Sequence, residues 1–447
     1  MRKILCLLLA LTLLAGCAAA EESWMPLQDC HRVKLTWKDT KQSNGSIVRL
    51  WHAETALPEV TQFVNSLAED FAEELGPALP KGKGTGSGSS RADVEIRYSR
   101  TGLSWLSFLV QARVSKSRKL TDQRIASVTF DMATGAEIGL TDIFADDSPA
   151  WEQLAGPIRE QITAYFPDKA PDEAALAAAV TAEGLSETDF TLHGMSLVLH
   201  YPAERFYPGV HTLLEVTLMY PDIREYMTPE AQAATDNTAY YRFAALTFDD
   251  GPSRTNTTLV LQSLMKAGVR GTFFVIGNRI ANYQDLVQRE HDEGHAIGGH
   301  NWHHGNVSKS AASALRQMPA KVNRALIAAI GIPTRYDRVP YGLYPKMEKA
   351  KAGWAYIQWS LDTYDWRGRS TANIMQKVRK QATDGDIVLM HDIKDKTPAT
   401  ALEMAQWMQE NGFMLLTVDE LFAKDGITLE PNRTYWRNAG GETGIKH

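Results

Sequence analysis

Leu246-Thr247-Phe248-Asp249-Asp250-Gly251-Pro252 sets two adjacent carboxylates where an apolar run meets a Gly-Pro turn. The apolar residues before Asp249 are typical of a buried strand, and such strands carry their functional groups on the loop that follows. Because two neighbouring carboxylates repel each other, a site that uses both gives them different tasks, for example holding a cation and acting as a base. A solvated turn rich in Asp, Gly and Pro is the alternative that this run alone leaves open.

Beyond residue 240, strand-like runs alternate with helical stretches. The strand-like runs are Phe243–Phe248, Thr272–Ile276, Ala296–Gly299, Tyr356–Leu361, Ile387–Met390 and Met414–Val418. The helical stretches are Thr257–Ala267, Tyr283–Glu293, Ser310–Ile330, Ile374–Ala382 and Pro398–Glu410. This alternation predicts parallel strands, in an α/β barrel or a doubly wound sheet. In both architectures the site lies at the carboxyl ends of the strands, where Asp249 and Asp250 stand.

Residues 34–226 follow a different pattern, which predicts an α+β region, with two subdomains as one possibility. Period-2 faces such as Leu106–Val114 predict strands, and Pro58–Leu75 and Ala150–Phe166 have helical spacing. Pro58 suits a first helical position. No constellation of catalytic residue types stands out here. The histidines of this region are expected to be structural rather than ligands, and they are His193, His200 and His211.

The remaining segments are assigned from composition. Residues 81–90, rich in Gly and Ser, predict a flexible loop, and the polar, Ala-rich residues 227–240 predict a linker. The catalytic domain is then expected at 241–425, with a C-terminal tail at 426–447.

The N-terminus has the pattern of an export signal. Two basic residues precede the apolar stretch Ile4–Leu14, which is too short to span a bilayer as a helix. Leu14-Ala15-Gly16-Cys17 resembles the lipobox of bacterial lipoproteins. Residues 1–16 are therefore expected to be a signal peptide, Cys17 a lipidated first residue that anchors the protein to a membrane, and 17–33 a tether. A plain signal peptide is the alternative.

Composition narrows the possible partners. The 447 residues suffice for two or three domains, and 44% of them are apolar. The formal charge is −6 and no basic tract occurs, so no nucleic-acid partner is expected. After removal of the signal and lipidation of Cys17, only Cys30 remains, which leaves no intrachain disulfide.

A candidate metal site follows the third strand-like run. His300 and His304 are four residues apart, so on one helical turn they would share a face and bind one metal ion. Asp250 would add an oxygen ligand, and this donor set suits a zinc-like ion. Three protein ligands leave a position open for water, as in catalytic sites. His303 is the rival partner of His300, because residues three apart also share a helical face.

Further polar groups stand at the ends of later strands. They occur in Arg338-Val339-Pro340-Tyr341-Gly342, Trp359–Trp366 and Leu389-Met390-His391-Asp392. Each is ordinary singly, whereas together with Asp249–Asp250 and His300–His304 they place Asp, His, Arg and Trp at the ends of five strand candidates.

Residues 242–423 resemble the polysaccharide deacetylase (NodB-homology) domain of carbohydrate esterase family 4. Its five motifs occur in order: T-F-D-D-G-P at 247–252, H-x-x-x-H at 300–304, R-x-P-Y at 338–341, D-x-x-D-W at 362–366 and L-x-H at 389–391. The resemblance implies an irregular (β/α) barrel. It also implies one divalent metal ion, zinc first, with cobalt, manganese or nickel as alternatives.

The resemblance assigns roles to the first group of residues. Asp250, His300 and His304 would hold the metal ion. Asp249 would be the general base. Arg338 would hold the Asp249 side chain and keep it ionised.

It also assigns the second group. His391 would protonate the leaving amine, and Asp365 would keep His391 protonated. The backbone N–H of Tyr341 would help to hold the oxyanion. Trp366 and Leu389 would wall a slot for the acetyl methyl group.

Two positions depart from the family pattern. Asn301 stands where Ser or Thr is usual, which leaves the detail of the loop open, and Val339 stands where Pro is common. Neither change removes a reactive group.

The region 34–226 resembles domains of unknown function found ahead of some extracytoplasmic deacetylases and in a lysozyme-sensing anti-sigma factor. The matching phrases are 129–137 and 140–144. We therefore expect an exported, membrane-anchored lipoprotein of the bacterial cell envelope that removes acetyl groups from an N-acetylated envelope glycan, peptidoglycan first. Chitooligosaccharides or acetylxylan are alternative substrates, and a lysozyme- or glycan-binding surface lipoprotein is the alternative from another class.

Overall fold

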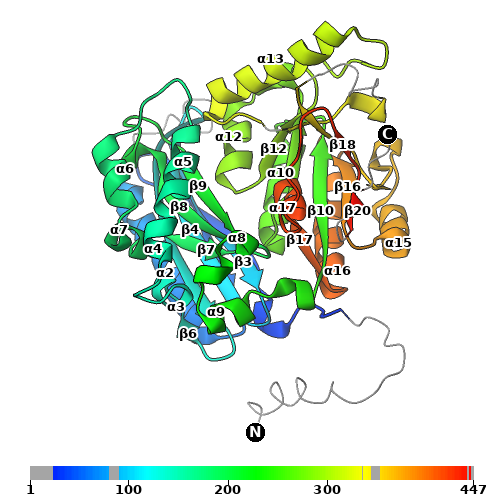
Figure 1. The fold of residues 1–447 in the computed structure, drawn as a ribbon. Coiled ribbons are helices and arrows are strands. Elements are labelled where there is room, and N and C mark those ends of the chain that lie inside the picture. Colours follow the sequence, from blue (N-terminus) through cyan, green and yellow to red (C-terminus); the bar gives the residue numbers. More distant parts are fainter. Residues whose placement is uncertain (1–23, 80–89, 335, 344–352, 440–441, 444–447) are drawn as a thin grey trace, which may run out of the picture.

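The computed structural model describes residues 24–79, 90–334, 336–343, 353–439 and 442–443. The predicted signal peptide, Cys17 and nearly all of the predicted loop 81–90 lie outside these residues. Figure 1 shows the N-terminal region, blue to green, beside a second region that runs from green to red. Among the described residues, no helix combines the length and the apolar character that a bilayer crossing needs.

The first half of the N-terminal region is a six-stranded sheet with one long helix on it. The strands follow the order β1 to β6, and only β2 and β3 pair in parallel. Their bounds are Lys34–Lys41, Ile47–Glu54, Ser90–Thr101, Trp105–Lys116, Lys119–Asp131 and Ala136–Glu137. Helix α2 (Pro58–Ala78) begins at Pro58, as predicted, and its buried residues share a core with the sheet.

The second half of the N-terminal region has its own sheet and its own core. Strands β7 (Phe190–Leu192), β8 (Ser196–Pro202) and β9 (Leu213–Met219) pair in antiparallel order. The helices around them are α3 (Leu140–Ile143), α4 (Ala150–Gln153), α5 (Ala155–Ala164), α6 (Glu173–Ala179), α7 (Ala182–Ser186), α8 (Tyr220–Ile223) and α9 (Pro229–Ala234). The predicted helix Ala150–Phe166 is thus two helices.

The second region is the predicted α/β fold, an irregular barrel. The sheet order is β15-β16-β10-β11-β12-β13-β14-β18, with β17 also on β10, and all pairings are parallel. The strands are β10 (Arg242–Asp249), β11 (Thr272–Val275), β12 (Ala296–Gly299), β13 (Tyr336–Asp337), β14 (Ala355–Ile357), β15 (Leu361–Asp362), β16 (Asp386–His391), β17 (Phe413–Leu416) and β18 (Thr434–Tyr435). Within the described part of the chain, no pairing joins β15 to β18, so the barrel stays open.

Helices cover this sheet, and apolar side chains fill the space between. The helices are α10 (Asn256–Ala267), α11 (Gly277–Ile280), α12 (Gln284–Asp292), α13 (Ala312–Ile330), α15 (Thr371–Gln381), α16 (Thr397–Glu410) and α17 (Val418–Ala423). Helix α10 ends at Gly268 and α13 at Gly331, both with positive φ, which glycine adopts without strain. Figure 1 shows α13 along the top of the molecule, above α12 and β12.

Three boundaries differ from the sequence predictions. The run Tyr356–Leu361 divides into β14 and β15, which lie on opposite sides of the sheet order. The predicted linker 227–240 is folded, because it forms α9 and buries Ala231 in the core of the N-terminal region. The predicted tail supplies β18, which pairs with β14.

Buried charged side chains join the two regions. Arg113 of β4 lies 2.5 Å from Glu95 of β3 and 3.1 Å from Glu293, which follows α12. Arg289 of α12 lies 2.7 Å from Glu293 and 3.7 Å from Glu95 of the N-terminal region. Since a buried charge is costly without a partner, these ion pairs hold the N-terminal region on the amino ends of the barrel strands.

Candidate active site

Strand register brings the predicted site residues to one edge of the sheet. Asp249, the last residue of β10, is the register partner of His391, the last residue of β16. Gly299 at the end of β12 pairs with Asp337 at the end of β13, and these positions lead into His300 and Arg338. Because parallel strands end at the same edge, residues far apart in the chain converge there.

Asp250, His300 and His304 form the group predicted to hold a metal ion. One ligand atom of each lies within 4.8 Å of the others. Asp250 Oδ1 lies 3.0 Å from His304 Nε2 and 3.4 Å from His300 Nε2, and this buried oxygen makes no hydrogen bond to any described residue. Among the described residues this is the one such group of His, Cys, Asp and Glu side chains.

Electrostatics suit this group to a cation. Burial alone would raise the pKa of Asp250, but the facing His300 and His304 hold the pKa of its carboxyl well below the usual range. His300 Nδ1 lies 2.7 Å from the carbonyl oxygen of Arg338, so Nδ1–H donates and Nε2 is left facing Asp250. One carboxylate and two imidazoles are a donor set that divalent zinc-like ions accept.

The local structure around the two histidines differs from the prediction. The segment 300–306 is a loop, not a helical turn, and both Asn301 and His304 have positive φ angles, 61° and 56°. His303, the rival partner, lies 3.2 Å from Asn278 and outside the group. His300 and His304 therefore lie together as the four-residue spacing predicted, but a loop and not a helical turn brings them together.

Asn301 braces this loop. Its side-chain nitrogen donates to the carbonyl oxygen of Gly305 at 3.2 Å, and its side-chain oxygen accepts from the N–H of Trp302. Asn tolerates the left-handed backbone conformation better than most residues. The departure from the usual Ser or Thr is thus accompanied by two local hydrogen bonds.

Asp249 is held by a fully buried guanidinium. Arg338 Nη1 donates to Asp249 Oδ1 at 2.7 Å and to Thr247 Oγ1 at 2.8 Å. Two carbonyl oxygens, of Ile357 and Gln358, accept its other hydrogen bonds at 3.0 Å each. The plane of Asp249 is therefore fixed, while Oδ2 lies 3.7 Å from His300 Nε2.

His391 and Asp365 form a second coupled pair. His391 Nδ1 lies 2.8 Å from Asp365 Oδ1, and Asp365 Oδ2 accepts from the backbone N–H of His391 and from Thr397 Oγ1. Burial would lower the pKa of His391, but the hydrogen bond and charge of Asp365, with the charges of Asp249 and Asp250, raise it above the usual value. This imidazole is poised to carry a proton.

The three residues predicted to contact substrate have different exposures. Leu389 is buried in β16 two residues before His391, and so faces the same side of the sheet. Tyr341 and Trp366 are 60% and 45% exposed, which leaves their side chains open to a ligand. The Tyr341 ring lies 4.7 Å from that of His304, between centroids.

Two buried carboxyls belong to the site without having been predicted. Burial raises the pKa of Asp337 and of Asp392 to about 7 each. Asp392 bonds to Thr257 and leaves no space for a Cβ at Gly251, the glycine of the first motif. The signal was visible in the sequence, because both acids directly adjoin motif residues, Arg338 and His391.

A cationic patch flanks the site and was also missed. The side chains of Arg367, Arg369 and Lys377 surround the ring of Tyr364, with Arg367 Cζ 4.5 Å from its centroid and from that of Trp366. No ion pair is formed by either arginine among the described residues. The chain as a whole has a negative net charge, whereas this patch is positively charged.

Comparison with known proteins places the chain among deacetylases. Residues 236–355 match the sequence profile described as polysaccharide deacetylase. The peptidoglycan-N-acetylglucosamine deacetylase of Listeria monocytogenes is 30% identical over 67% of this chain and 64% of its own length. The chain thus spans somewhat less than two thirds of that relative.

Shorter relatives are covered more completely. A chitooligosaccharide deacetylase of Bradyrhizobium is 36% identical over 34% of this chain and 71% of its own length. Among solved structures, peptidoglycan deacetylase PdaC from Bacillus subtilis is 30% identical over 41% of this chain and 91% of that chain, with a TM-score of 0.40.

Proposed function

The chain belongs to the polysaccharide deacetylase family, and from that premise we propose that it is a metal-dependent N-deacetylase. It would release acetate from N-acetylated sugars of a cell-envelope glycan. Peptidoglycan is the glycan that we propose. The observation that carries this proposal is the convergence of three units at one edge of the sheet. They are the Asp250, His300 and His304 group, the Asp249–Arg338 pair and the His391–Asp365 pair.

The chemistry divides among these units. A divalent cation held by Asp250, His300 and His304, zinc first, would lower the pKa of a water molecule and polarise the acetamide carbonyl. Asp249, oriented by Arg338, accepts the proton of the attacking water.

The remaining residues serve the tetrahedral intermediate and its collapse. The N–H of Tyr341 donates to the developing oxyanion. His391, held by Asp365, then gives its proton to the departing nitrogen, and the products are acetate and an amine. Leu389 and Trp366 border the space for the acetyl methyl group.

Two observations favour peptidoglycan over chitin or acetylxylan. Relatives from Listeria, Bacillus subtilis and Bacillus cereus carry names of peptidoglycan deacetylases. The patch of Arg367, Arg369 and Lys377 beside Trp366 suits a glycan whose side groups bear carboxylates, as muramic acid and its peptides do. Chitin is uncharged and would gain nothing from it.

The proposed location is the cell envelope, with Cys17 as the lipid attachment site. The support is the lipobox-like sequence Leu14–Cys17 together with the envelope substrates named for the relatives. The alternative of a lysozyme-binding lipoprotein is not favoured, because these relatives are named as deacetylases.

Acetate release tests the proposal. The purified protein is stripped with a chelator, reloaded with zinc, cobalt, manganese or nickel, and supplied with peptidoglycan, chitooligosaccharide or acetylxylan. We expect metal-restored release, fastest from peptidoglycan, and none in Asp249→Asn. Release that persists without metal overturns the mechanism, and faster release from chitooligosaccharide or acetylxylan overturns the choice of glycan.

A further inference from the structure

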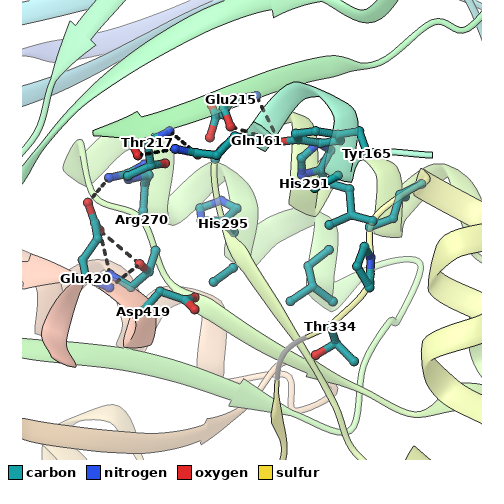
Figure 2. A pocket seen from close by; sticks show the side chains of 18 of the residues that line it. Gln161, Tyr165, Glu215, Thr217, Arg270, His291, His295, Thr334, Asp419 and Glu420 are labelled. Carbon is teal, nitrogen blue, oxygen red and sulfur yellow. Dashed lines mark hydrogen bonds and ion pairs between the residues drawn. The ribbon is translucent and has the colours of Figure 1, made fainter. Parts of the chain in front are cut away.

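A pocket lies between the two regions, at the opposite end of the barrel from the candidate active site. It has a volume of about 520 Å³, which falls within the range of small-molecule sites. Helix α5 and strand β9 of the N-terminal region form one side, and residues next to β12, β13 and α17 form the other. Figure 2 shows His295 in the middle of this pocket, with Glu215 and His291 above it.

Three nearly buried polar groups of this pocket keep an atom without a hydrogen bond. His295 is 6% exposed, and its Nδ1 accepts from the N–H of Gly271, so the proton is on Nε2, which makes no hydrogen bond within the described part of the chain. His291 is 7% exposed, and its Nε2–H donates to the carbonyl oxygen of Leu213, which leaves Nδ1 as a free acceptor. Among the described residues, Glu215 makes no side-chain hydrogen bond, and its Oε1 lies 3.6 Å from Nδ1 of His200, an imidazole whose pKa burial lowers.

Glu215 and His295 line the same pocket, and the backbone just before His295 lies against the Glu215 side chain. A Cβ at Gly294, the residue before His295, would lie 3.2 Å from Glu215 Oε1. Burial lowers the pKa of His295 to about 3, so this imidazole is neutral and offers one N–H. The cation of the pocket, Arg270, is already paired with Glu420. The pocket therefore presents a neutral donor beside an acceptor, and not a free positive charge.

Apolar side chains complete the lining. Ile297, Leu326 and Ile332 line the pocket. The ring of Tyr165 lies at its side, as Figure 2 shows. A ligand that fits this lining has an N–H or O–H for Glu215, a carbonyl or hydroxyl oxygen for His295, and an apolar surface. An acetamido group on a sugar ring offers all three, because its N–H and C=O are adjacent and carry a methyl group.

We propose that this pocket is a second saccharide-binding site, which takes an N-acetylated aminosugar unit of the same glycan. The N–H of the acetamido group donates to Glu215, and its carbonyl oxygen accepts from His295 Nε2–H. The choice of sugar rests on the proposed deacetylase function. A deacetylated unit loses the carbonyl, so the pocket discriminates between substrate and product.

The position of the pocket fits a long ligand. His295 precedes β12 and His300 follows it, so the two sites lie at opposite ends of one strand, about 16 Å apart at a rise of roughly 3.3 Å per residue. A glycan held at the pocket would keep its remaining units near the protein surface between reactions.

Titration calorimetry tests the proposal. The probe is N,N′-diacetylchitobiose, and the protein carries Asp249→Asn to stop turnover. We expect two equivalents to bind. Ala164→Trp, an exposed α5 residue that lines the pocket, should reduce the number to one, whereas Thr163→Trp, its exposed neighbour outside the lining, should leave two. Chitobiose without acetyl groups should not bind at the pocket.

Two results overturn the proposal: Ala164→Trp that leaves two equivalents bound, and chitobiose that binds the pocket as tightly as the acetylated form. Thermal unfolding of both tryptophan variants confirms that they are folded. With Asp249 intact, Ala164→Trp should release acetate from short substrates within about twofold of the unaltered protein. If the unaltered protein releases no acetate, the deacetylase proposal fails, while the calorimetry still decides whether the pocket binds an acetylated sugar.

Discussion

The two ends of the barrel strands bury charged side chains for different purposes. At the carboxyl ends, Asp250 keeps a buried oxygen without a hydrogen bond, and Tyr341 and Trp366 stay exposed beside it. At the amino ends, Arg113 and Arg289 are closed in ion pairs with Glu95 and Glu293. An open set of charges can accept a ligand, whereas a closed set can only hold parts of the protein together. Substitutions at the carboxyl ends should therefore reduce activity with little loss of stability. Substitutions at the amino ends should reduce stability and leave the activity of the folded protein unchanged.

The largest effect is expected from the candidate metal group. His304→Ala removes one ligand from Asp250, His300 and His304, and acetate release should fall by about 10³-fold or more, with little loss of stability. The matched control is His303→Ala, since His303 lies outside the group. Acetate release and zinc content are measured for both. Equal losses of activity in the two variants would contradict the assignment of the group.

Arg113→Ala tests the other end of the barrel. Glu95 and Glu293 would stay buried without their shared cation, which should cost about 3–5 kcal/mol of the free energy of unfolding. The fraction that remains folded should keep its turnover number. Urea denaturation gives the stability, and Arg379→Ala, an exposed residue paired with Glu403, is the control that should cost less than about 1 kcal/mol. If Arg113→Ala stops turnover in folded protein, the two ends are not independent.

Asp365→Asn tests the proton donor. Asp365 raises the pKa of His391, so the substitution should lower that pKa and shorten the pH range in which His391 is protonated. The alkaline limb of the profile of kcat against pH should move to lower pH, and kcat at neutral pH should fall by about 10- to 100-fold. An unshifted alkaline limb would mean that another group supplies the proton.

The smallest effect is expected at the cationic patch. The double variant Arg367→Ala, Arg369→Ala should lower kcat/KM on muramic-acid-containing glycan by about 5- to 10-fold, because a charge-assisted contact is lost. Turnover of neutral chitooligosaccharide should not change. Arg379→Ala should affect neither substrate. An equal loss of kcat/KM on both substrates would show that the patch does not recognise the charge of the glycan.

The convergence of residues at the carboxyl ends could be predicted from the sequence, because these residues follow strand ends and are separated by short spacings. Asp249, Asp250, His300, His304, Arg338, Asp365 and His391 all converge as predicted. The helical turn for His300 and His304 was wrong, since Asn301 and His304 adopt left-handed backbone conformations that no spacing rule reports. The loop, and not a helix, positions the histidines.

The amino-end network and its pocket could not be predicted in the same way. Glu95, Arg113 and Glu215 come from the N-terminal region, whereas Glu293 and His295 come from the barrel. No motif links them, because they meet only through the packing of two regions. Strand β18 was missed for a related reason: two residues are too few for a period-2 pattern, and β14 alone makes them a strand.

The register of β10 and β16 has a consequence for the order of assembly. Thr247 and Val388, joined by a hydrogen bond, are 141 residues apart in the chain, and Arg338 reaches Asp249 across 89 residues. Contacts this distant in sequence raise the contact order and form late in folding. A partly folded chain therefore has neither Asp249 opposite His391 nor a guanidinium beside it. The proposed hydrolytic activity therefore requires the complete barrel, and a partly folded chain would lack it.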